Sequence, residues 1–356
     1  MTHSAPLRVL AVGDSYMPAS VFAAALAGLG DAVSVTELEL GTAGPAPPRT
    51  ESDRSLREYA GDPADLVAAA PGHDALLVHG APVSAEVLDA APLRLVCCAR
   101  GGPVNVDVAA ASRRGIPVTN APGRNAAAVA ELTIAFALML IRGVPAAARY
   151  LTAGGQLAES TYEGSQFLGG EVAGLTLGLV GLGNVGREVA ARARALGFPV
   201  LGYDPVPPPV LPPGVTLVGL DELLSRSRLV SLHARATPAN RHLVGPAAFA
   251  RMPRGAYFIN TARESLVDED ALAAALASGG LAGAALDVVE RRPAGDRHPL
   301  LDLPNVVITP HIGGATHETL RRGADMAAAA VAAVASGEVP DHLVNPEVLV
   351  PEEAAP

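Results

Sequence analysis

Short runs of β-branched residues alternate with Ala-rich helical stretches along the whole chain. Four such runs lie in the first hundred residues, and a second series of six begins at residue 176. Runs of this length, with a helix between each pair, are typical of parallel strands joined by crossover helices. The pattern predicts an α/β fold with strands at residues 8–13, 33–39, 75–80, 93–99, 176–181, 199–204, 229–234, 256–262, 283–289 and 305–311.

The two series of strands predict two domains, as expected for 356 residues. Residues 117–123 are interpreted as a segment that crosses between the domains, followed by a long helix over about 125–142. A last helix over about 316–336 is long enough to return to the first domain. We therefore expect a discontinuous first domain, 1–116 with 317–356, and a second domain, 117–316.

The composition excludes several classes of function. All 26 positively charged side chains are Arg, so chemistry that needs a Schiff-base or P-loop lysine is excluded. The formal net charge of −10 argues against a nucleic acid or an anionic membrane as the partner. The sequence carries no specific signal for a metal.

The cysteines and the apolar runs bear on location. Cys97 and Cys98 are adjacent and form no disulfide framework, which favours a reducing cytoplasm. The N-terminus shows no signal-peptide pattern, and the longest uncharged apolar stretches have ten residues, whereas a membrane span needs about 20. We expect a soluble protein.

A glycine motif opens the second series. Gly181, Gly183 and Gly186, with Asn184 and Val185 between the last two, follow an expected strand and precede an expected helix. Such glycines permit a tight turn and close approach to a pyrophosphate at the helix N-terminus. Asp204 ends the next strand, where a carboxylate would bind ribose hydroxyls and repel a 2′-phosphate, which favours NAD over NADP. Alternatively, the glycines only form a turn and Asp204 is solvated.

Four stretches together resemble the D-2-hydroxyacid dehydrogenase family, in particular its phosphoglycerate and glycerate dehydrogenase-like members. They occur in the family's order and spacing over nearly the whole chain, at residues 99–123, 176–187, 255–272 and 305–316. The resemblance implies two Rossmann-like, doubly wound parallel-sheet domains with an interdomain cleft. The first domain would bind substrate and the second, inserted domain would bind NAD.

The resemblance also implies roles for individual residues. Arg263 would bind and polarise the substrate, since a guanidinium can fork onto a carboxylate and a keto oxygen. His311 would be the acid–base group, because ketone reduction needs a proton donor that titrates near neutrality. Backbone N–H groups of Gly101 and Gly102 would hold the substrate carboxylate. The nicotinamide half of the cofactor pocket would be lined by His233, Thr237, Thr261, Ala262, Asp287 and Gly313.

One position departs from the family pattern. In the family, a Glu lies five residues after the Asp that corresponds to Asp287, and this Glu hydrogen-bonds the catalytic His. In this chain that position holds Arg292. Glu290 could reach the His through a backbone shift, His311 could work without its partner, or Arg292 could bind a second anionic group of the substrate. Arg100, beside the Gly101–Gly102 loop, could supply a second cation to such a site. Both arginines could also be ordinary surface residues.

These observations lead to one function hypothesis and two alternatives. The chain is expected to interconvert a 2-oxo acid and a D-2-hydroxy acid with NAD as cofactor. One alternative is a divergent member of the family that acts on a phosphorylated or phosphono acid. The other is a regulatory protein that binds NAD and has lost catalysis. The apolar helix over 126–141 is a candidate surface for a homodimer.

Overall fold

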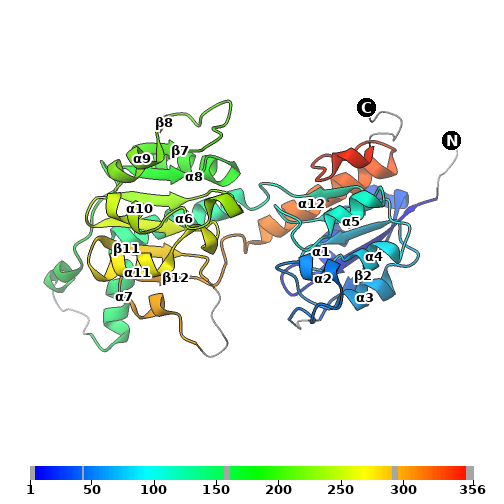
Figure 1. Cartoon of the computed structure of the whole chain (residues 1–356), viewed down its shortest axis with the longest axis horizontal. Coiled ribbons are helices and arrows are strands. Elements are labelled where there is room, and N and C mark those ends of the chain that lie inside the picture. Colours follow the sequence, from blue (N-terminus) through cyan, green and yellow to red (C-terminus); the bar gives the residue numbers. More distant parts are fainter. Residues whose placement is uncertain (1–4, 42–43, 156–160, 291–295, 350–356) are drawn as a thin grey trace. The chain divides into compact units, whose positions relative to one another are not determined.

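The computed structural model describes residues 5–41, 44–155, 161–290 and 296–349. The chain forms two compact units (Figure 1), which we call unit 1 (Met1–Arg124 and Thr316–Pro356) and unit 2 (Asn125–Ala315). The chain leaves unit 1 after Arg124, later than the expected crossing at 117–123. The difference arises because Val118–Asn120 pairs with the neighbouring strand and completes the sheet of unit 1.

Unit 1 contains a parallel five-stranded sheet in the order β2-β1-β3-β4-β5. The strands are β1 (Leu7–Gly13), β2 (Val33–Glu39), β3 (Ala75–Val78), β4 (Leu95–Cys98) and β5 (Val118–Asn120). Its α-helices are α1 (Ala19–Leu26), α2 (Glu51–Ser55), α3 (Pro63–Ala69), α4 (Ala85–Asp89), α5 (Val108–Arg113) and α12 (His317–Ala335), and its 3₁₀ helices are η1 (Ala27–Ala32) and η6 (Pro346–Leu349).

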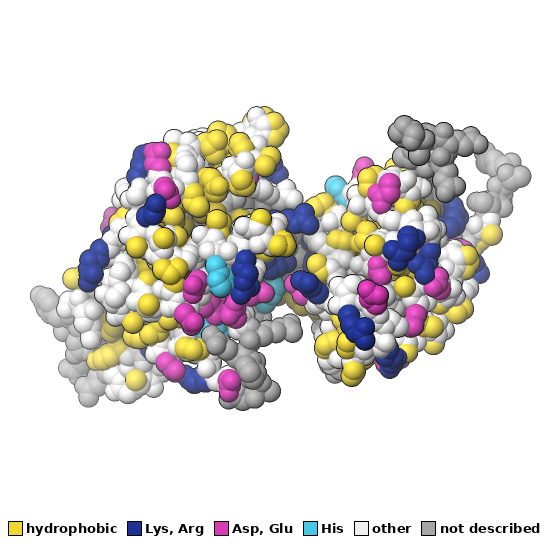
Figure 2. Space-filling view, in the orientation of Figure 1, with side chains coloured by type: hydrophobic (Ala, Val, Ile, Leu, Met, Phe, Trp, Pro, Cys, Tyr) yellow, Lys and Arg dark blue, Asp and Glu magenta, His cyan; other side chains and the backbone are white. Residues whose placement is uncertain are grey.

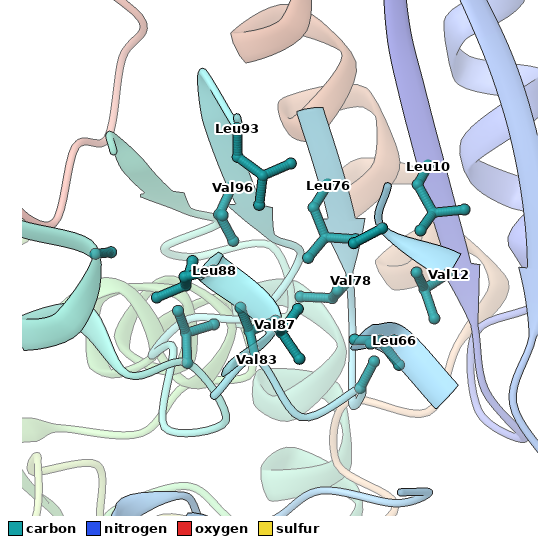
Figure 3. Close-up of a cluster of buried hydrophobic side chains, with 14 of the residues drawn as sticks. Leu10, Val12, Leu66, Leu76, Val78, Val83, Val87, Leu88, Leu93 and Val96 are labelled. Carbon is teal, nitrogen blue, oxygen red and sulfur yellow. The ribbon is translucent and has the colours of Figure 1, made fainter. Parts of the chain in front are cut away.

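Strands β1, β3 and β4 are buried on both faces of this sheet, which explains their near-continuous apolar sequences. Leu10 and Val12 of β1 point into the cluster shown in Figure 3, which includes side chains of α3 and α4. Val9 and Ala11 point to the opposite face, where α1 and α12 pack. This alternation follows from the two-residue period of a strand.

Unit 2 contains a parallel seven-stranded sheet in the order β12-β11-β10-β9-β6-β7-β8. The strands are β6 (Leu177–Val180), β7 (Val200–Tyr203), β8 (Val215–Leu217), β9 (Leu229–Leu232), β10 (Ala256–Asn260), β11 (Leu281–Leu286) and β12 (Val306–Ile308). Its α-helices are α6 (Ala126–Ile141), α7 (Val144–Thr152), α8 (Asn184–Ala195), α9 (Leu220–Arg226), α10 (Pro246–Arg251) and α11 (Glu269–Ala277). Its 3₁₀ helices are η2 (Thr161–Phe167), η3 (Pro238–Asn240), η4 (Glu264–Leu266) and η5 (Pro299–Asp302).

Helices cover both faces of this second sheet as well. Side chains of α6 and α8 share one core cluster with the strands, and those of α9, α10 and α11 share the other. The prediction of doubly wound parallel sheets is thus confirmed in both units. The elements that were not predicted include the strands β5 and β8, which are only three residues long, and the helix α7.

Within the described residues, no single helix has the length and apolar character needed to cross a membrane. Helices α6 and α7 meet those criteria only when taken together, and they are bent by 70° relative to each other.

Candidate active site

The glycine motif forms a tightly packed turn between β6 and α8. Gly181 has a φ of 100°, and a Cβ there would lie 2.6–2.7 Å from the backbone of His233 and Ala234. A Cβ on Gly186 would lie 2.1 Å from the carbonyl oxygen of Gly181. A Cβ on Gly183 would meet nothing within 4 Å. The outer two glycines are therefore required by the fold, and the middle one keeps an open space above the turn.

Gly183 is also the N-cap residue of α8, which begins at Asn184. Asn184 and Val185 thus belong to the first turn, whose N–H groups have no partner within the helix. A helix N-terminus of this kind attracts the negative charge of a pyrophosphate. The open space beside Gly183 fits such a group.

Asp204 follows β7 directly and its carboxylate is oriented toward the glycine turn. One oxygen accepts a hydrogen bond from the N–H of Leu182 at 2.8 Å, and the other accepts from the N–H of Val206 at 3.0 Å. The carboxylate is thus fixed beside the turn by two amides. An acidic group in this place fits the ribose hydroxyls of NAD.

His233 lies at the point where the order of strands in the sheet reverses, between β6 and β9. Burial lowers the pKa of His233 to about 3, so its ring is neutral. Its Nε2 lies 2.9 Å from Oγ of Ser231, whereas Nδ1 is buried and has no hydrogen-bond partner among the described residues. A buried polar atom without a partner at a switch point is a feature that a bound ligand would explain.

Asn260 organises the loop that carries Arg263. Its side-chain oxygen accepts from the N–H of Ala262 at 2.9 Å, and its amide nitrogen donates to the carbonyl of Arg263 at 2.9 Å. Arg263 is exposed, and its Nη1 donates to the carbonyl of Ala262 at 2.7 Å. Sequence reasoning did not assign a role to Asn260, although its place at the end of β10 was the available signal.

Two threonines of the expected cofactor pocket form hydrogen bonds within the protein. The hydroxyl of Thr261 lies 3.1 Å from that of Thr133 in α6, so this side chain is buried against the helix. Thr237 caps η3, and its N–H donates to Oδ1 of Asn240 at 2.7 Å. Thr261 directly follows β10, and Thr237 lies in the loop after β9. The carbonyl of Thr237 also accepts from the N–H of Asn240 at 3.2 Å, so its backbone is engaged within this turn.

Asp287 holds the loop that carries His311. Its buried carboxylate accepts hydrogen bonds from the hydroxyl of Thr309 at 2.6 Å and from the N–H groups of Ile312 at 2.8 Å and Gly313 at 2.7 Å. Its carbonyl accepts from the N–H of His311 at 3.0 Å. His311 is exposed and has a backbone φ of 57°, a conformation that residues other than Gly rarely adopt.

The expected partner of the His311 ring is not observed. Among the described residues, no hydrogen bond to this ring is present, and Arg292 lies outside them. Glu290 does not take the partner's place, because its carboxylate lies 3.7 Å from Nη2 of Arg241 and 4.0 Å from Nε2 of His242. Its N–H donates to Glu269 at 2.7 Å, which fixes this end of the segment. The alternative in which Glu290 reaches His311 is therefore not the observed arrangement.

The candidate residues of unit 1 follow β4. The guanidinium of Arg100 donates to the carbonyl of Glu58 at 2.7 Å and also pairs with the Glu58 carboxylate. Gly101 and Gly102 are exposed, and a Cβ on either would meet nothing within 4 Å. The side chain of Asn120 supports the loop by donating to the carbonyl of Gly101 at 2.9 Å. The loop thus presents open backbone.

In unit 2 the candidate residues share one edge of the sheet. They lie in the segments that follow β6, β7, β9, β10, β11 and β12, which are parallel strands of one sheet, so their carboxyl ends meet at the same edge. Open α/β sheets bind ligands at this edge. No group of three or more His, Cys, Asp or Glu side chains able to hold a metal occurs in the described part of the chain.

Residues 134–313, which lie within unit 2, match the family model for the NAD-binding domain of D-isomer specific 2-hydroxyacid dehydrogenases. The chain belongs to this family, and its cofactor is NAD. The glycine turn, the orientation of Asp204 and the unpartnered Nδ1 of His233 all fit this cofactor.

Similarity to individual proteins supports this family assignment. The D-3-phosphoglycerate dehydrogenase of Mycobacterium tuberculosis is 43% identical over 296 residues, 82% of this chain and 55% of that protein. The glyoxylate reductase of Korarchaeum cryptofilum is 41% identical over 271 residues, 75% of this chain and 81% of that protein. The crystal structure of the TT0316 protein from Thermus thermophilus has a TM-score of 0.76 at 36% identity and covers 95% of this chain and 100% of its own. The chain spans about half the length of the phosphoglycerate dehydrogenases.

Proposed function

We propose that the protein interconverts a 2-oxo acid and a D-2-hydroxy acid by hydride transfer. The observation that supports this most is the common placement of Arg263, His311 and the glycine turn at one edge of the sheet in unit 2. The reaction requires a cation that binds the substrate anion, a ring that can transfer a proton, and a turn that binds the dinucleotide.

Each residue has a distinct role in the proposed reaction. Arg263 binds the carboxylate and polarises the keto oxygen, because its planar group can donate two parallel hydrogen bonds. His311 gives a proton to that oxygen during reduction and accepts it during oxidation. NADH, when bound, supplies the hydride that adds to C2. Asp287 keeps the backbone of His311 in place.

Unit 1 is proposed to be the substrate domain. The open backbone of Gly101 and Gly102 would bind the substrate carboxylate, and Arg100 would lie beside it. The pairing of Arg100 with Glu58 leaves this residue less available as an anion ligand than the sequence suggested. For a phosphorylated or phosphono acid, Arg292 is then the stronger candidate for a second cation.

The partner is proposed to be a small acid, not a nucleic acid or a membrane. Acidic and basic side chains are interspersed over the face shown in Figure 2, and the formal net charge is −10. A basic tract, which such polyanionic partners would need, does not dominate this face.

A homodimer is proposed through unit 2. Most apolar side chains of α6 are buried in the core of unit 2, so the helix as a whole is not the surface that its composition suggested. Its exposed Leu138, together with Val144 and Leu151 of α7 and Leu168, which is 87% exposed, leaves large apolar side chains in solvent. Burying them against a second copy would lower the free energy of association.

A reducing cytoplasm is the proposed location. Cys97 and Cys98 are free thiols that point to opposite faces of the sheet, and burial raises their pKa values to about 12 and about 11. Such thiols are unreactive and need no disulfide partner.

The test is NADH oxidation with glyoxylate, pyruvate, hydroxypyruvate and phosphorylated or phosphono 2-oxo acids, measured for the wild type and Arg292→Glu. Turnover confined to anionic-tailed acids, and lost in Arg292→Glu, would make Arg292 a substrate ligand. A gain of activity in Arg292→Glu would mean that His311 works without its usual partner. Tight NADH binding without turnover of any acid would contradict the proposal and favour a regulatory role.

A further inference from the structure

A buried polar cluster lies outside the candidate active site, at the switch point of the sheet in unit 1. The strand order places β1 beside β3, and the residues that directly follow them are Asp14 and His79. Open α/β sheets hold ligands at such points. Here the chain's own side chains occupy the position, because a Cβ on Gly80 would already lie 2.8 Å from the carboxylate of Asp14.

The carboxylate of Asp14 is fully engaged. One oxygen accepts from the N–H groups of Tyr16 and Met17, both at 2.8 Å. The other accepts from the N–H of Gly80 at 2.6 Å and lies 3.0 Å from Nδ1 of His79. Since an ionised carboxylate can only accept hydrogen bonds, Nδ1 of His79 carries the proton.

The other ring nitrogen of His79 is an acceptor. Its Nε2 lies 3.1 Å from Nη2 of Arg124, and a guanidinium can only donate. Burial lowers the pKa of His79, and the nearby charges of Arg124 and Arg100 lower it further against the opposing effect of Asp14. Because Nε2 accepts from a guanidinium, the ring is neutral, and Tyr16 stacks on it with ring centroids 4.9 Å apart. Both nitrogens of the ring thus have fixed and different roles.

Arg124 connects this cluster to both crossings of the chain. It is the last residue of unit 1 before unit 2, is only 8% exposed, and donates through Nη1 to the carbonyl of Thr319 at 3.4 Å. Its own carbonyl accepts from Nε of Arg322 at 2.7 Å. A Cβ on Gly323 would lie 3.0 Å from Cδ of Arg124, so the returning helix α12 packs directly on this side chain. The outgoing segment and the returning helix are bound to each other here.

We propose that Asp14, His79 and Arg124 form a hydrogen-bond relay that fixes both crossings of the chain in unit 1, and that His79 and Arg124 are positioning residues for the reaction. This inference rests on the proposed function, because positioning matters only if residues of the two units act on one substrate. Closure of domains around a substrate depends on a few residues where the chain crosses. The relay gives those residues a rigid base in the core of unit 1.

Two histidine variants separate the parts of the relay. Asn at position 79 can still donate to Asp14 but has no group at the place of Nε2, whereas Gln can place an oxygen there to accept from Arg124. Arg124→Met removes the guanidinium and keeps much of the side-chain volume. Arg113→Met is the matched control, since Arg113 is an exposed residue of the same unit.

The experiment measures turnover, NADH affinity and amide hydrogen exchange in the full chain. We expect Arg124→Met and His79→Asn to lower kcat by about tenfold or more, His79→Gln to lower it less, and Arg113→Met to leave it unchanged. The dissociation constant of NADH should stay within about twofold, because the candidate cofactor residues lie in unit 2. Exchange should accelerate at the amides of Ala121 and Leu320, which are hydrogen-bonded at the two crossings, while β1 and β3 stay protected.

Several results would overturn this inference. Equal kcat values for Arg124→Met and Arg113→Met would do so, as would unchanged exchange at the crossings. Loss of amide exchange protection across the whole sheet of unit 1 in His79→Asn would show that Asp14, His79 and Arg124 only stabilise the fold of this unit in general. If Arg124→Met does not fold, His79→Asn compared with His79→Gln decides. If the wild type turns over no 2-oxo acid, the proposed function fails, and the exchange data still decide whether the relay fixes the crossings.

Discussion

Asp287 and His311 are bound through the backbone of the loop that follows β12. The carbonyl of Asp287 accepts from the N–H of His311 at 3.0 Å, and its carboxylate accepts from the next two amides along the chain. These contacts hold His311 at a φ of 57°. The backbone of His311 is therefore fixed by a residue that follows the neighbouring strand β11, and strain at this residue is offset by three hydrogen bonds.

Asp287→Asn should reduce activity by releasing this loop. An amide group would place N–H donors against at least one N–H donor of the loop, so at least one buried hydrogen bond is lost, at a cost of about 1–3 kcal/mol. We expect kcat to fall by about tenfold or more and the free energy of unfolding to fall by about 1–3 kcal/mol. Steady-state kinetics and urea unfolding measure both. Asp221→Asn, at an exposed ion pair, is the control, and equal kcat values in the two variants would refute the role of Asp287.

Arg263→Lys should weaken substrate binding although the charge is retained. A lysine ammonium cannot make the parallel pair of hydrogen bonds that a guanidinium makes with a carboxylate. We expect KM for the 2-oxo acid to rise about tenfold or more and kcat to fall, with NADH affinity nearly unchanged. The exposed Arg251→Lys serves as the comparison. A kinetic profile of Arg263→Lys that matches that of Arg251→Lys would contradict the assignment.

Gly181→Ala should lower stability, whereas Gly183→Ala should weaken cofactor binding. A methyl group at position 181 would clash with the backbone of His233 at a φ of 100°, so we expect unfolding free energy to fall by about 2 kcal/mol or more. A methyl group at position 183 meets open space in the free protein, so stability should change little while NADH affinity falls. Urea unfolding and NADH fluorescence titration test this. Equal effects of both variants on stability would contradict it.

The stability of the protein should fall below pH 6.5 partly because of His233. Burial keeps this ring neutral down to about pH 3 in the folded protein, whereas the unfolded chain protonates it near the ordinary pKa of 6.5. Protons therefore bind preferentially to the unfolded state, and the contribution of His233 is complete above pH 6.5 and lost as the pH falls toward 3. The expected slope is at most about 1.4 kcal/mol per pH unit.

Urea unfolding at pH 7 and pH 5 measures this contribution. His233→Gln should lose less unfolding free energy between the two pH values than the wild type does. His317→Gln, at an exposed position of α12, should behave as the wild type. A pH dependence that is the same in all three proteins would show that His233 does not titrate in this way.

The features that could be predicted from the sequence are those set by local pattern. The glycine turn, the strand before it and Asp204 lie within a short stretch, and the strand ends that carry Arg263 and His311 follow apolar runs. Short, continuous apolar runs predict parallel strands, because the strands of such a sheet are buried on both faces. β5 was missed as a strand because a run of three residues carries too little pattern.

The features that could not be predicted depend on distant partners. Asp14 and His79 are 65 residues apart, and His79 and Arg124 are 45 apart, so no local pattern joins them. The engagement of Glu290 with Arg241 likewise depends on how two loops meet. The apolar helix α6 was a candidate dimer surface, whereas most of its apolar side chains lie in the core, because composition alone does not say which partner covers a helix.

The most direct measurement is NADH oxidation at 340 nm with the panel of 2-oxo acids, comparing the wild type with His311→Gln. Glutamine can keep a hydrogen bond to the keto oxygen but cannot transfer a proton, so kcat should fall by about 10²–10⁴ while NADH affinity is retained. A wild type that turns over at least one acid, with this loss in His311→Gln, is the expected result. A His311→Gln variant as active as the wild type would contradict the assignment of His311 as the acid–base group.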